Sequence, residues 1–401
     1  FAQYKIQEFG SGIVGMITNH GYLDNPTFRG MRQSLMQTFD EIYILDLHGN
    51  ALKRETCPDG SKDENVFDIR QGVAIAFFIK HQDARDQVVR HTEIWGTRDQ
   101  KYDALERSDI SNTTWNTLQP QPPLYLFKPR DEVLAAQYNA FISLADIFPV
   151  SSVGIVTARD NLTIHWSPEE VWSTVTAFSQ MEQSLARQAY CLGNDTRDWK
   201  VELAQRDLLD SGPTRDKIVP LLYRPFDIRY TYYTGRARGF ICRPRSEVMQ
   251  QMLKGENLAI ITPKRVEHIG SWQHAFVSER ITEHVAVSLK TIDYHFPLYL
   301  YPEEEKDQLS LFSHPNHTDR QPNLNPIIFE LLNQAFNMTV TPEMIFYYVY
   351  AILYTPIYRE KYAEFLRMDF PRIVFPVNYE VFLAIAAFGE ILTALHLLKA
   401  P

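Results

Sequence analysis

Three short apolar runs near the N-terminus constrain the fold of this chain most. They are Ile13–Thr18, Ile42–Leu47 and Val73–Ile79, and each has the length of a strand. Runs without polar alternation are typical of strands that are covered on both faces of a sheet. We therefore predict an α/β arrangement for the first 118 residues.

A helix is expected between the first two runs. The segment Phe28–Phe39 carries Met31 and Leu35 at helical spacing, Asn25 can cap its start, and Pro26 suits the first helical turn. A strand, a helix and a second strand in this order predict a parallel pair joined by a right-handed crossover.

The pattern changes after a proline-rich segment. Gln119–Pro123 reads Gln-Pro-Gln-Pro-Pro and is the best linker candidate. Residues 124–335 mix short apolar runs with turn residues, which predicts an α+β region, whereas residues 341–399 are mostly helical, with starts at Thr341 and Asn378. We therefore predict two domains, residues 1–118 and 119–401.

Composition excludes several classes of protein. The chain has 401 residues, a net charge of −9, and 45 % hydrophobic residues, so it is neither a disordered chain nor a globally basic coat protein. Its three cysteines, Cys57, Cys191 and Cys242, lie far apart, which excludes a zinc finger and a disulfide framework and favours a cytoplasmic location. No apolar run reaches the roughly 18 residues of a membrane span, so no membrane partner is expected.

One stretch departs strongly from this average charge. Arg224–Arg245 contains six arginines and one aspartate, and residues 224–265 together carry +6, which leaves −15 for the rest of the chain. Arginine suits phosphate groups and guanine edges, and interleaved tyrosines can stack on a nucleic acid. A solvated strand pair whose arginines bind acidic residues elsewhere is an almost equally good interpretation.

Other motif-like strings carry less weight. Gly10–Gly15 matches G-x-G-x-x-G but precedes the first strand, so we interpret it as a turn. The histidines show no metal-ligand spacing, and we predict no metal site. His20 and His48 follow strand ends, where ligand sites tend to lie in α/β sheets. Solvated loop histidines are an equally good interpretation. The arginines around Cys242 can lower the pKa of its thiol, but no nucleophile arrangement accompanies it.

Longer strings resemble one enzyme family. The segments that resemble the later motifs of the adenine-N6 DNA methylase in Type ISP restriction–modification enzymes are Gly12–Leu35, Ile42–Asn50 and Asn65–Lys80. The segments that resemble the C-terminal specificity domain of that family are Tyr223–Asp227, Gly239–Pro244, Phe296–Pro302 and Pro342–Pro371.

This resemblance implies a fold and a place in a larger protein. It implies a partial, doubly wound, Rossmann-like α/β methyltransferase sheet whose last strands include an antiparallel one. An α+β specificity domain with a helical C-terminal part follows. In such enzymes the cofactor motifs and an Asn-Pro-Pro-Tyr loop come first. We therefore expect this chain, which starts at Phe1 without a methionine, to be a C-terminal fragment beginning just after that loop, with upstream nuclease or translocase domains possible.

The resemblance also implies a reaction. A methyl group passes from S-adenosylmethionine to the N6 of an adenine that is flipped out of the duplex. Phe67 matches the position of an aromatic wall for the flipped base, although a plain core position is the alternative. Asn19, His20 and Tyr22 follow the first strand and would edge the same pocket. The main cofactor motifs are absent from this chain, so we expect the 401 residues alone to be inactive.

Double-stranded DNA is the expected partner of the second domain. The residues that we predict to line its DNA face are Arg224, Arg229, Arg236, Arg238, Arg243, Arg245, Lys264 and Arg265. A DNA-binding specificity fragment without catalysis is the alternative function, and coding sequence upstream would distinguish the two. An unrelated α/β metabolic enzyme is a weaker third interpretation.

Overall fold

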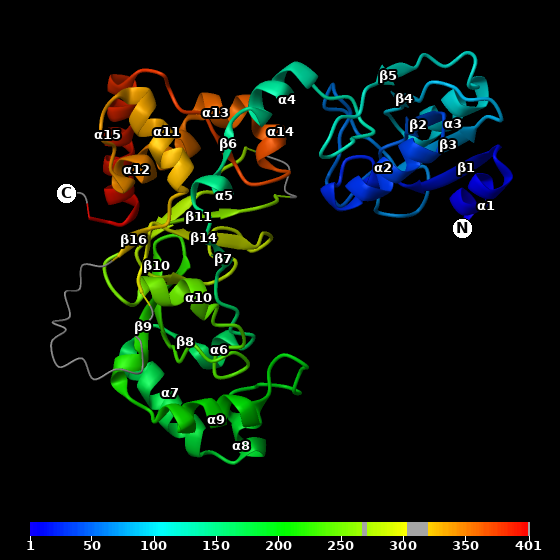
Figure 1. The fold of residues 1–401 in the computed structure, drawn as a ribbon. Coiled ribbons are helices and arrows are strands. Elements are labelled where there is room, and N and C mark those ends of the chain that lie inside the picture. Colours follow the sequence, from blue (N-terminus) through cyan, green and yellow to red (C-terminus); the bar gives the residue numbers. More distant parts are fainter. Residues whose placement is uncertain (267–270, 303–319, 400–401) are drawn as a thin grey trace. The chain divides into compact units, whose positions relative to one another are not determined.

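The computed structural model of the chain describes residues 1–266, 271–302 and 320–399. The chain divides into two compact units, unit 1 at Phe1–Ala135 and unit 2 at Ala136–Pro401 (Figure 1). The division falls within helix α4 (Glu132–Asn139), whereas the sequence placed the domain boundary between residues 118 and 119.

Unit 1 contains one five-stranded sheet in the order β1-β3-β2-β4-β5. Its strands are β1 (Gly12–Asn19), β2 (Glu41–Asp46), β3 (Val73–Lys80), β4 (Val88–Glu93) and β5 (Asn116–Leu118). Its helices are α1 (Ala2–Phe9), α2 (Arg29–Thr38) and α3 (Arg98–Arg107), with short 3₁₀ turns at His20–Tyr22 and Pro26–Phe28.

The predicted strand–helix–strand arrangement of β1, α2 and β2 is confirmed, and strand β3 lies between β1 and β2 in the sheet. Strand β3 pairs antiparallel with both β1 and β2, so that Ala76 lies opposite Met16 on one side and Ile44 on the other. Strands β1 and β2 consequently run in the same direction, and their carboxyl ends lie at the same edge of the sheet.

Strand β1 lies at one end of this strand order, not in its middle. Ile13, Met16 and Ile17 are 68 %, 48 % and 55 % exposed, so the expectation of burial on both faces is wrong for this run. Apolar composition alone does not separate an edge strand from a central one. Gly10, in the left-handed conformation with a φ of 80°, ends helix α1 directly before β1, as expected for a turn.

A buried arginine fixes the segment after the proline-rich linker to unit 1. The Arg32 guanidinium is completely buried and donates hydrogen bonds to the carbonyl oxygens of Tyr22 and Asn25, and to those of Leu124 and Tyr125. Burial lowers the pKa of Arg32 to about 10. These bonds explain why unit 1 extends beyond the predicted boundary.

Unit 2 is built on two four-stranded sheets (Figure 1). The first has the order β13-β9-β10-β8, with β13 (Ile281–Thr282), β9 (Ile218–Arg224), β10 (Asp227–Tyr232) and β8 (Ile164–His165). The second has the order β12-β11-β14-β7, with β12 (Phe276–Ser278), β11 (Ala259–Pro263), β14 (Asp293–Pro297) and β7 (Ser152–Val153). Two small pairs join β15 (Tyr299–Leu300) to β16 (Gln321–Pro322) and β17 (Arg372–Ile373) to β6 (Ile142–Ser143).

Helices surround these sheets, as the α+β prediction requires. Those before the C-terminal part are α5 (Leu144–Ile147), α6 (Asp160–Thr163), α7 (Pro168–Gln180), α8 (Gln183–Ala189), α9 (Val201–Ser211) and α10 (Ser246–Met249), with 3₁₀ turns at Arg215–Lys217 and Gln250–Met252. Those of the C-terminal part are α11 (Pro326–Phe336), α12 (Pro342–Tyr354), α13 (Pro356–Lys361), α14 (Ala363–Leu366) and α15 (Tyr379–His396).

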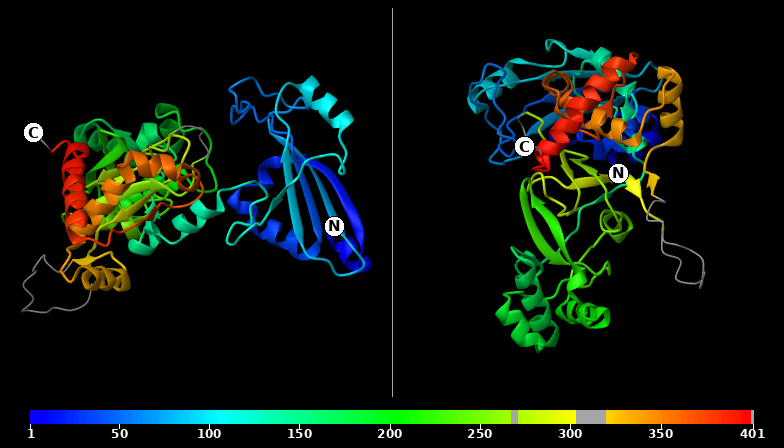
Figure 2. Two further views of the ribbon diagram at one scale, coloured as in Figure 1. Left: turned by 90° about the horizontal axis from the view of Figure 1, so that it is seen from above. Right: turned by 90° about the vertical axis from the view of Figure 1, so that its left-hand side faces the viewer.

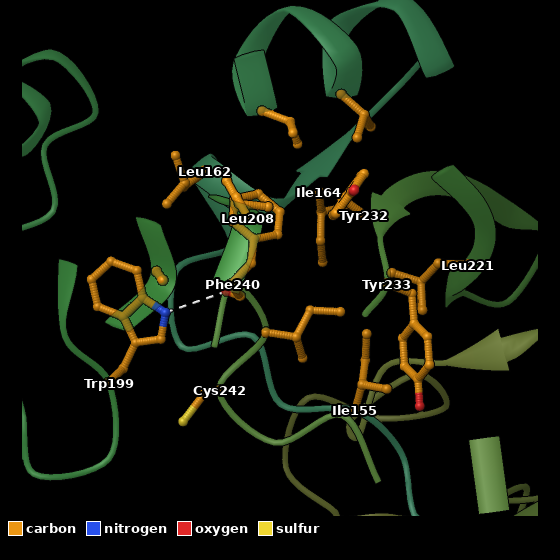
Figure 3. Packing of buried hydrophobic residues seen from close by; sticks show 14 of the residues in the cluster. Ile155, Leu162, Ile164, Trp199, Leu208, Leu221, Tyr232, Tyr233, Phe240 and Cys242 are labelled. Carbon is orange, nitrogen blue, oxygen red and sulfur yellow. Dashed lines mark hydrogen bonds between the residues drawn. The ribbon is translucent and has the colours of Figure 1, made fainter. Parts of the chain in front are cut away.

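An extensive apolar core of unit 2 lies between α7, α9 and the hairpin β9–β10. Figure 3 shows Leu208, Leu221 and Tyr232 of these elements packed together. The indole of Trp199 lies in the same core and donates a hydrogen bond to the Phe240 carbonyl oxygen over 3.3 Å. The segment after β10, which carries several of the predicted DNA-binding arginines, is therefore anchored in the core.

The predicted helix starts of the C-terminal part are confirmed. Thr341 caps α12 and Asn378 caps α15 through their side-chain oxygens. The two helices pack side by side, with α15 in red in Figure 2, and a Cβ atom on Gly389 would overlap the backbone of Tyr347. Helix α15 is the one helix of the described residues that is long and apolar enough to cross a membrane by length and composition, but this close packing is that of a helix in a folded domain.

Candidate nucleic-acid interface

The hairpin β9–β10 holds two of the predicted arginines in ion pairs. Arg224 lies 2.9 Å from the buried carboxylate of Glu283. The Arg229 guanidinium pairs with Asp227 over 2.9 Å and lies 4.0 Å from the ring centres of both Trp166 and Tyr223. These charges are compensated within the protein, as the alternative interpretation of the basic stretch foresaw.

Two further arginines follow the hairpin in an exposed loop. Arg236 forms an ion pair with Asp210 over 2.5 Å, and both side chains are about half exposed, at 49 % and 55 %. Arg238 is exposed, and its backbone amide donates to the Cys242 carbonyl oxygen. An exposed ion pair is weak, so Arg236 can exchange Asp210 for a phosphate at a small energetic loss.

The remaining four predicted residues line one concave surface. Its volume is about 650 Å³. Among the described residues of its lining, the cationic side chains are Arg243, Arg245, Lys264, Arg265 and Lys290, and Asp198 is the only carboxylate. We call this surface the basic groove. Its excess of positive charge gives it a potential that attracts polyanions.

Backbone pairing fixes the floor of the basic groove. Arg243 and Val156 exchange two backbone hydrogen bonds of 2.9 and 3.0 Å. The buried Asp207 carboxylate accepts hydrogen bonds from the Phe240 amide and the Thr234 hydroxyl, each shorter than 3 Å. Burial raises the pKa of Asp207.

The charged groups at the groove partly pair with one another. Arg243 lies 2.9 Å from Asp198, and hydrogen bonds from Arg197 and Arg243 lower the pKa of that carboxyl. Lys264 lies 3.7 Å from Asp369. His284 also lines the groove, and its hydrogen bond with Glu283 raises its pKa, while the Glu283 carboxylate compensates the charge of the protonated imidazole.

Cys242 has no reactive thiol. Its side chain is 3 % exposed and donates to the Asp198 carbonyl oxygen. Burial raises the pKa of this thiol, so the expectation that neighbouring arginines lower it is wrong. Desolvation of the thiolate outweighs the charge of Arg243.

In unit 1 the predicted pocket residues differ in exposure. Phe67 is 44 % exposed and lies in a loop, where its amide donates to the Asn65 side chain, so it is not a core residue. Asn19 is exposed, whereas His20 and Tyr22 are 2 % and 8 % exposed. Burial raises the pKa of Tyr22 to about 12. Within the described residues, no hydrogen bond or ring contact joins Phe67 to the other three.

His20 and His48 are buried, so the interpretation of both as solvated loop histidines is wrong. They are 2 % and 4 % exposed, and their rings lie edge to face with centroids 6.2 Å apart.

The comparison with protein families decides the identity of unit 2. A family model, the Type ISP C-terminal specificity domain, matches residues 146–401. The chain belongs to this family. The resemblance of the C-terminal segments to Type ISP enzymes is therefore confirmed.

Solved Type ISP structures and a further DNA complex share the fold across nearly the whole chain. The cryoEM structure of the DrdV–DNA complex is 24 % identical with a TM-score of 0.66, over 98 % of this chain and 38 % of that one. A nuclease-deletion mutant of the Type ISP enzyme LlaGI with a DNA substrate mimic is 23 % identical with a TM-score of 0.62, over 96 % and 35 %. The ATP-dependent Type ISP enzyme LlaBIII bound to DNA is 23 % identical with a TM-score of 0.67, over 98 % and 25 %.

The chain thus spans well under half the length of these structural neighbours. No curated protein matches it. Lys290 and His284 of the basic groove were not among the residues predicted from the sequence, because no local signal connects them with the arginine-rich stretch. Pairing of β14 with β11 and β7 brings their segment to the groove.

Proposed function

We propose that unit 2 recognises double-stranded DNA for a restriction–modification enzyme and that the basic groove contacts the DNA backbone. The five cationic side chains that converge on one concave surface carry this proposal. Lysine and arginine at such a surface neutralise phosphates and fix the register of the duplex, while base edges supply sequence information. The DNA complexes of the structural neighbours support it.

Removal of groove cations tests this proposal. The double variant Arg243→Ala, Lys290→Ala should weaken binding to a mixed-sequence duplex and make the slope of log K against log salt shallower by about 1–2. Fluorescence anisotropy over a range of salt concentrations measures both. The matched control is Arg206→Ala, which removes an equally exposed arginine paired with Glu202 on α9 and should leave the slope unchanged. An unchanged slope in the double variant contradicts the proposal.

We further propose that unit 1 is the end of a doubly wound, Rossmann-like adenine-N6 methyltransferase domain. The parallel strands β1 and β2 with the antiparallel β3 between them support this. A half-exposed Phe67 in the loop before β3 suits the wall of a flipped adenine. The parent enzyme would act in the cytoplasm.

S-adenosylmethionine would be the methyl donor of that parent enzyme. The residues described here do not fit a full site for it, because the G-x-G-x-x-G string ends α1 and begins β1, whereas a phosphate or nucleotide loop follows a strand. The 401 residues alone should transfer no methyl group, and micromolar binding of S-adenosylmethionine in isothermal titration would contradict this.

A further inference from the structure

We infer that unit 1 contains a site for a divalent transition-metal ion, formed by His20, His48 and Glu55. The two imidazoles are nearly fully buried, at 2 % and 4 % exposed, and Glu55 is 14 % exposed. One ligand atom from each of the three residues lies within 4.8 Å of the other two. This inference does not depend on the DNA-binding proposal, because it concerns unit 1 alone.

The fold brings the three residues together at one edge of the sheet. His20 follows the last residue of β1, His48 follows β2, and Glu55 lies in the loop after it. The ring of His20 lies against Gly72, where a Cβ atom would overlap it. Because β1 and β2 run in the same direction, their carboxyl ends present both histidines to the same space.

A carboxylate holds the outer nitrogen of each imidazole. His20 Nδ1 lies 2.9 Å from Asp46 Oδ1, and His48 Nε2 lies 3.1 Å from Glu93 Oε2. Each of these nitrogens therefore carries the proton that it donates. Metal-binding histidines are oriented in the same way, by a carboxylate at the nitrogen that does not bind the metal.

The inner nitrogens consequently carry lone pairs, and both lie about 4 Å from a Glu55 oxygen. His48 Nδ1 also lies 3.8 Å from Asp46 Oδ2. His48 Nδ1 is buried without a hydrogen-bond partner and lies 3.9 Å from Glu55 Oε2. His20 Nε2 lies 4.0 Å from Glu55 Oε1 and accepts a hydrogen bond of 3.2 Å from the Asn50 amide. A buried acceptor next to a carboxylate is unfavourable unless a cation or a proton lies between them.

The arrangement fits a zinc-type ion. Neutral imidazole and carboxylate are preferred ligands of Zn²⁺ at about 2.0–2.2 Å, which places ligand atoms about 3.4 Å apart in a tetrahedral site. His20 and His48 approach different oxygens of the Glu55 carboxylate, and the three candidate ligand atoms lie within 4.8 Å of one another. They therefore need to approach one another by up to about 1.4 Å to reach tetrahedral spacing. Glu55 lies in a turn-rich loop, which allows its carboxylate to move toward the imidazoles. Three protein ligands leave a fourth position for water.

Metal titration of the whole 401-residue chain tests the site. Isothermal titration with Zn²⁺ should give one ion per chain, and Co²⁺ should give the visible absorption band of a tetrahedral site. His48→Gln and Glu55→Gln should each weaken the Zn²⁺ affinity at least tenfold and abolish that band. Asp46→Asn, which removes the support of His20, should weaken it by about 10–100-fold.

His81→Gln is the matched control. His81 also lies in unit 1 and pairs with a carboxylate, Glu41, over 2.7 Å, but it belongs to no cluster of three ligands within the described residues. It should retain the affinity of the unaltered chain. Circular dichroism verifies that each variant is folded. Glu55 lies in a loop and is partly exposed, so Glu55→Gln should leave the fold intact even if His48→Gln does not, and its effect on Zn²⁺ affinity then reports on the site itself. Failure of the unaltered chain to bind Zn²⁺, or equal affinity in all variants, overturns the inference.

Discussion

Lys101 and Asp63 form an ion pair of 2.6 Å in which neither side chain has any exposed surface. The Lys101 ammonium also donates to the carbonyl oxygens of Leu47 and Glu64. The Asp63 carboxylate accepts from the backbone amides of Gly49 and Gly96. The pair thus connects helix α3 with the loop after β2, the loop that carries Glu55.

Removal of one partner should destabilise unit 1 strongly. Asp63→Ala leaves a buried ammonium without a counter-charge, and we expect a loss of about 3–5 kcal/mol in the free energy of unfolding. Urea denaturation followed by circular dichroism measures it. Asp59→Ala, an exposed aspartate of the same loop, should change stability by less than about 0.5 kcal/mol. Equal effects of the two substitutions would show that the buried pair contributes no special stability.

Asp293 should make the stability of unit 2 depend on pH. Burial raises the pKa of this carboxyl to about 7, because one of its oxygens is buried without a hydrogen-bond partner. Its pKa in the unfolded chain is about 3.9. Between these values the folded state holds more protons, so the stabilisation is complete below the lower pKa and is lost as the pH rises through 7.

The Asp293→Asn variant isolates this contribution. The unaltered chain should lose up to about 4 kcal/mol of stability relative to the variant as the pH rises through this window. Urea unfolding at intervals of pH measures the difference. A difference between the two proteins that does not vary with pH is the result that contradicts a raised pKa.

Arg236 and Arg238 offer a second test of the DNA-binding surface. Arg236→Ala combined with Arg238→Ala should weaken duplex binding and flatten its salt dependence, because both side chains are exposed cations. Asp210 loses its ion pair in this variant, so Asp210→Ala alone serves as the control and should strengthen binding slightly. Unchanged affinity and salt slope in the double variant would restrict DNA contact to the basic groove.

Local patterns predicted most of the fold and less of the site. The strand runs, the cap at Asn378 and the change to helices after Thr341 are all local signals, and all are confirmed. Strand β4 was missed because charged and polar residues interrupt its apolar positions: its sequence is Val-Val-Arg-His-Thr-Glu. The burial of Arg32 could not be predicted from the sequence, because its partners are backbone carbonyl oxygens, two of them about 90 residues away.

The two candidate sites depend on long-range pairing. Lys290 reaches the basic groove through strand β14, and His20 meets His48 only because β1 and β2 end at the same edge of the sheet. The sequence placed His20 and His48 at strand ends but did not show that their side chains meet, and no local pattern connects Lys290 with the arginine-rich stretch. The sequence predicted all eight basic residues as one DNA face, but composition does not separate Arg229, which stacks on Trp166 and Tyr223, from Arg243, which lines the groove.

Anchoring of the groove floor bears on the thermodynamics of association. Trp199 donates a hydrogen bond to the Phe240 carbonyl oxygen from within the core, and the backbones of Val156 and Arg243 pair with each other. A polyanion therefore meets a preorganised surface, and little backbone entropy is lost when it docks. Encounter rates then follow electrostatic steering, so ionic strength governs how fast a complex forms as much as how long it persists.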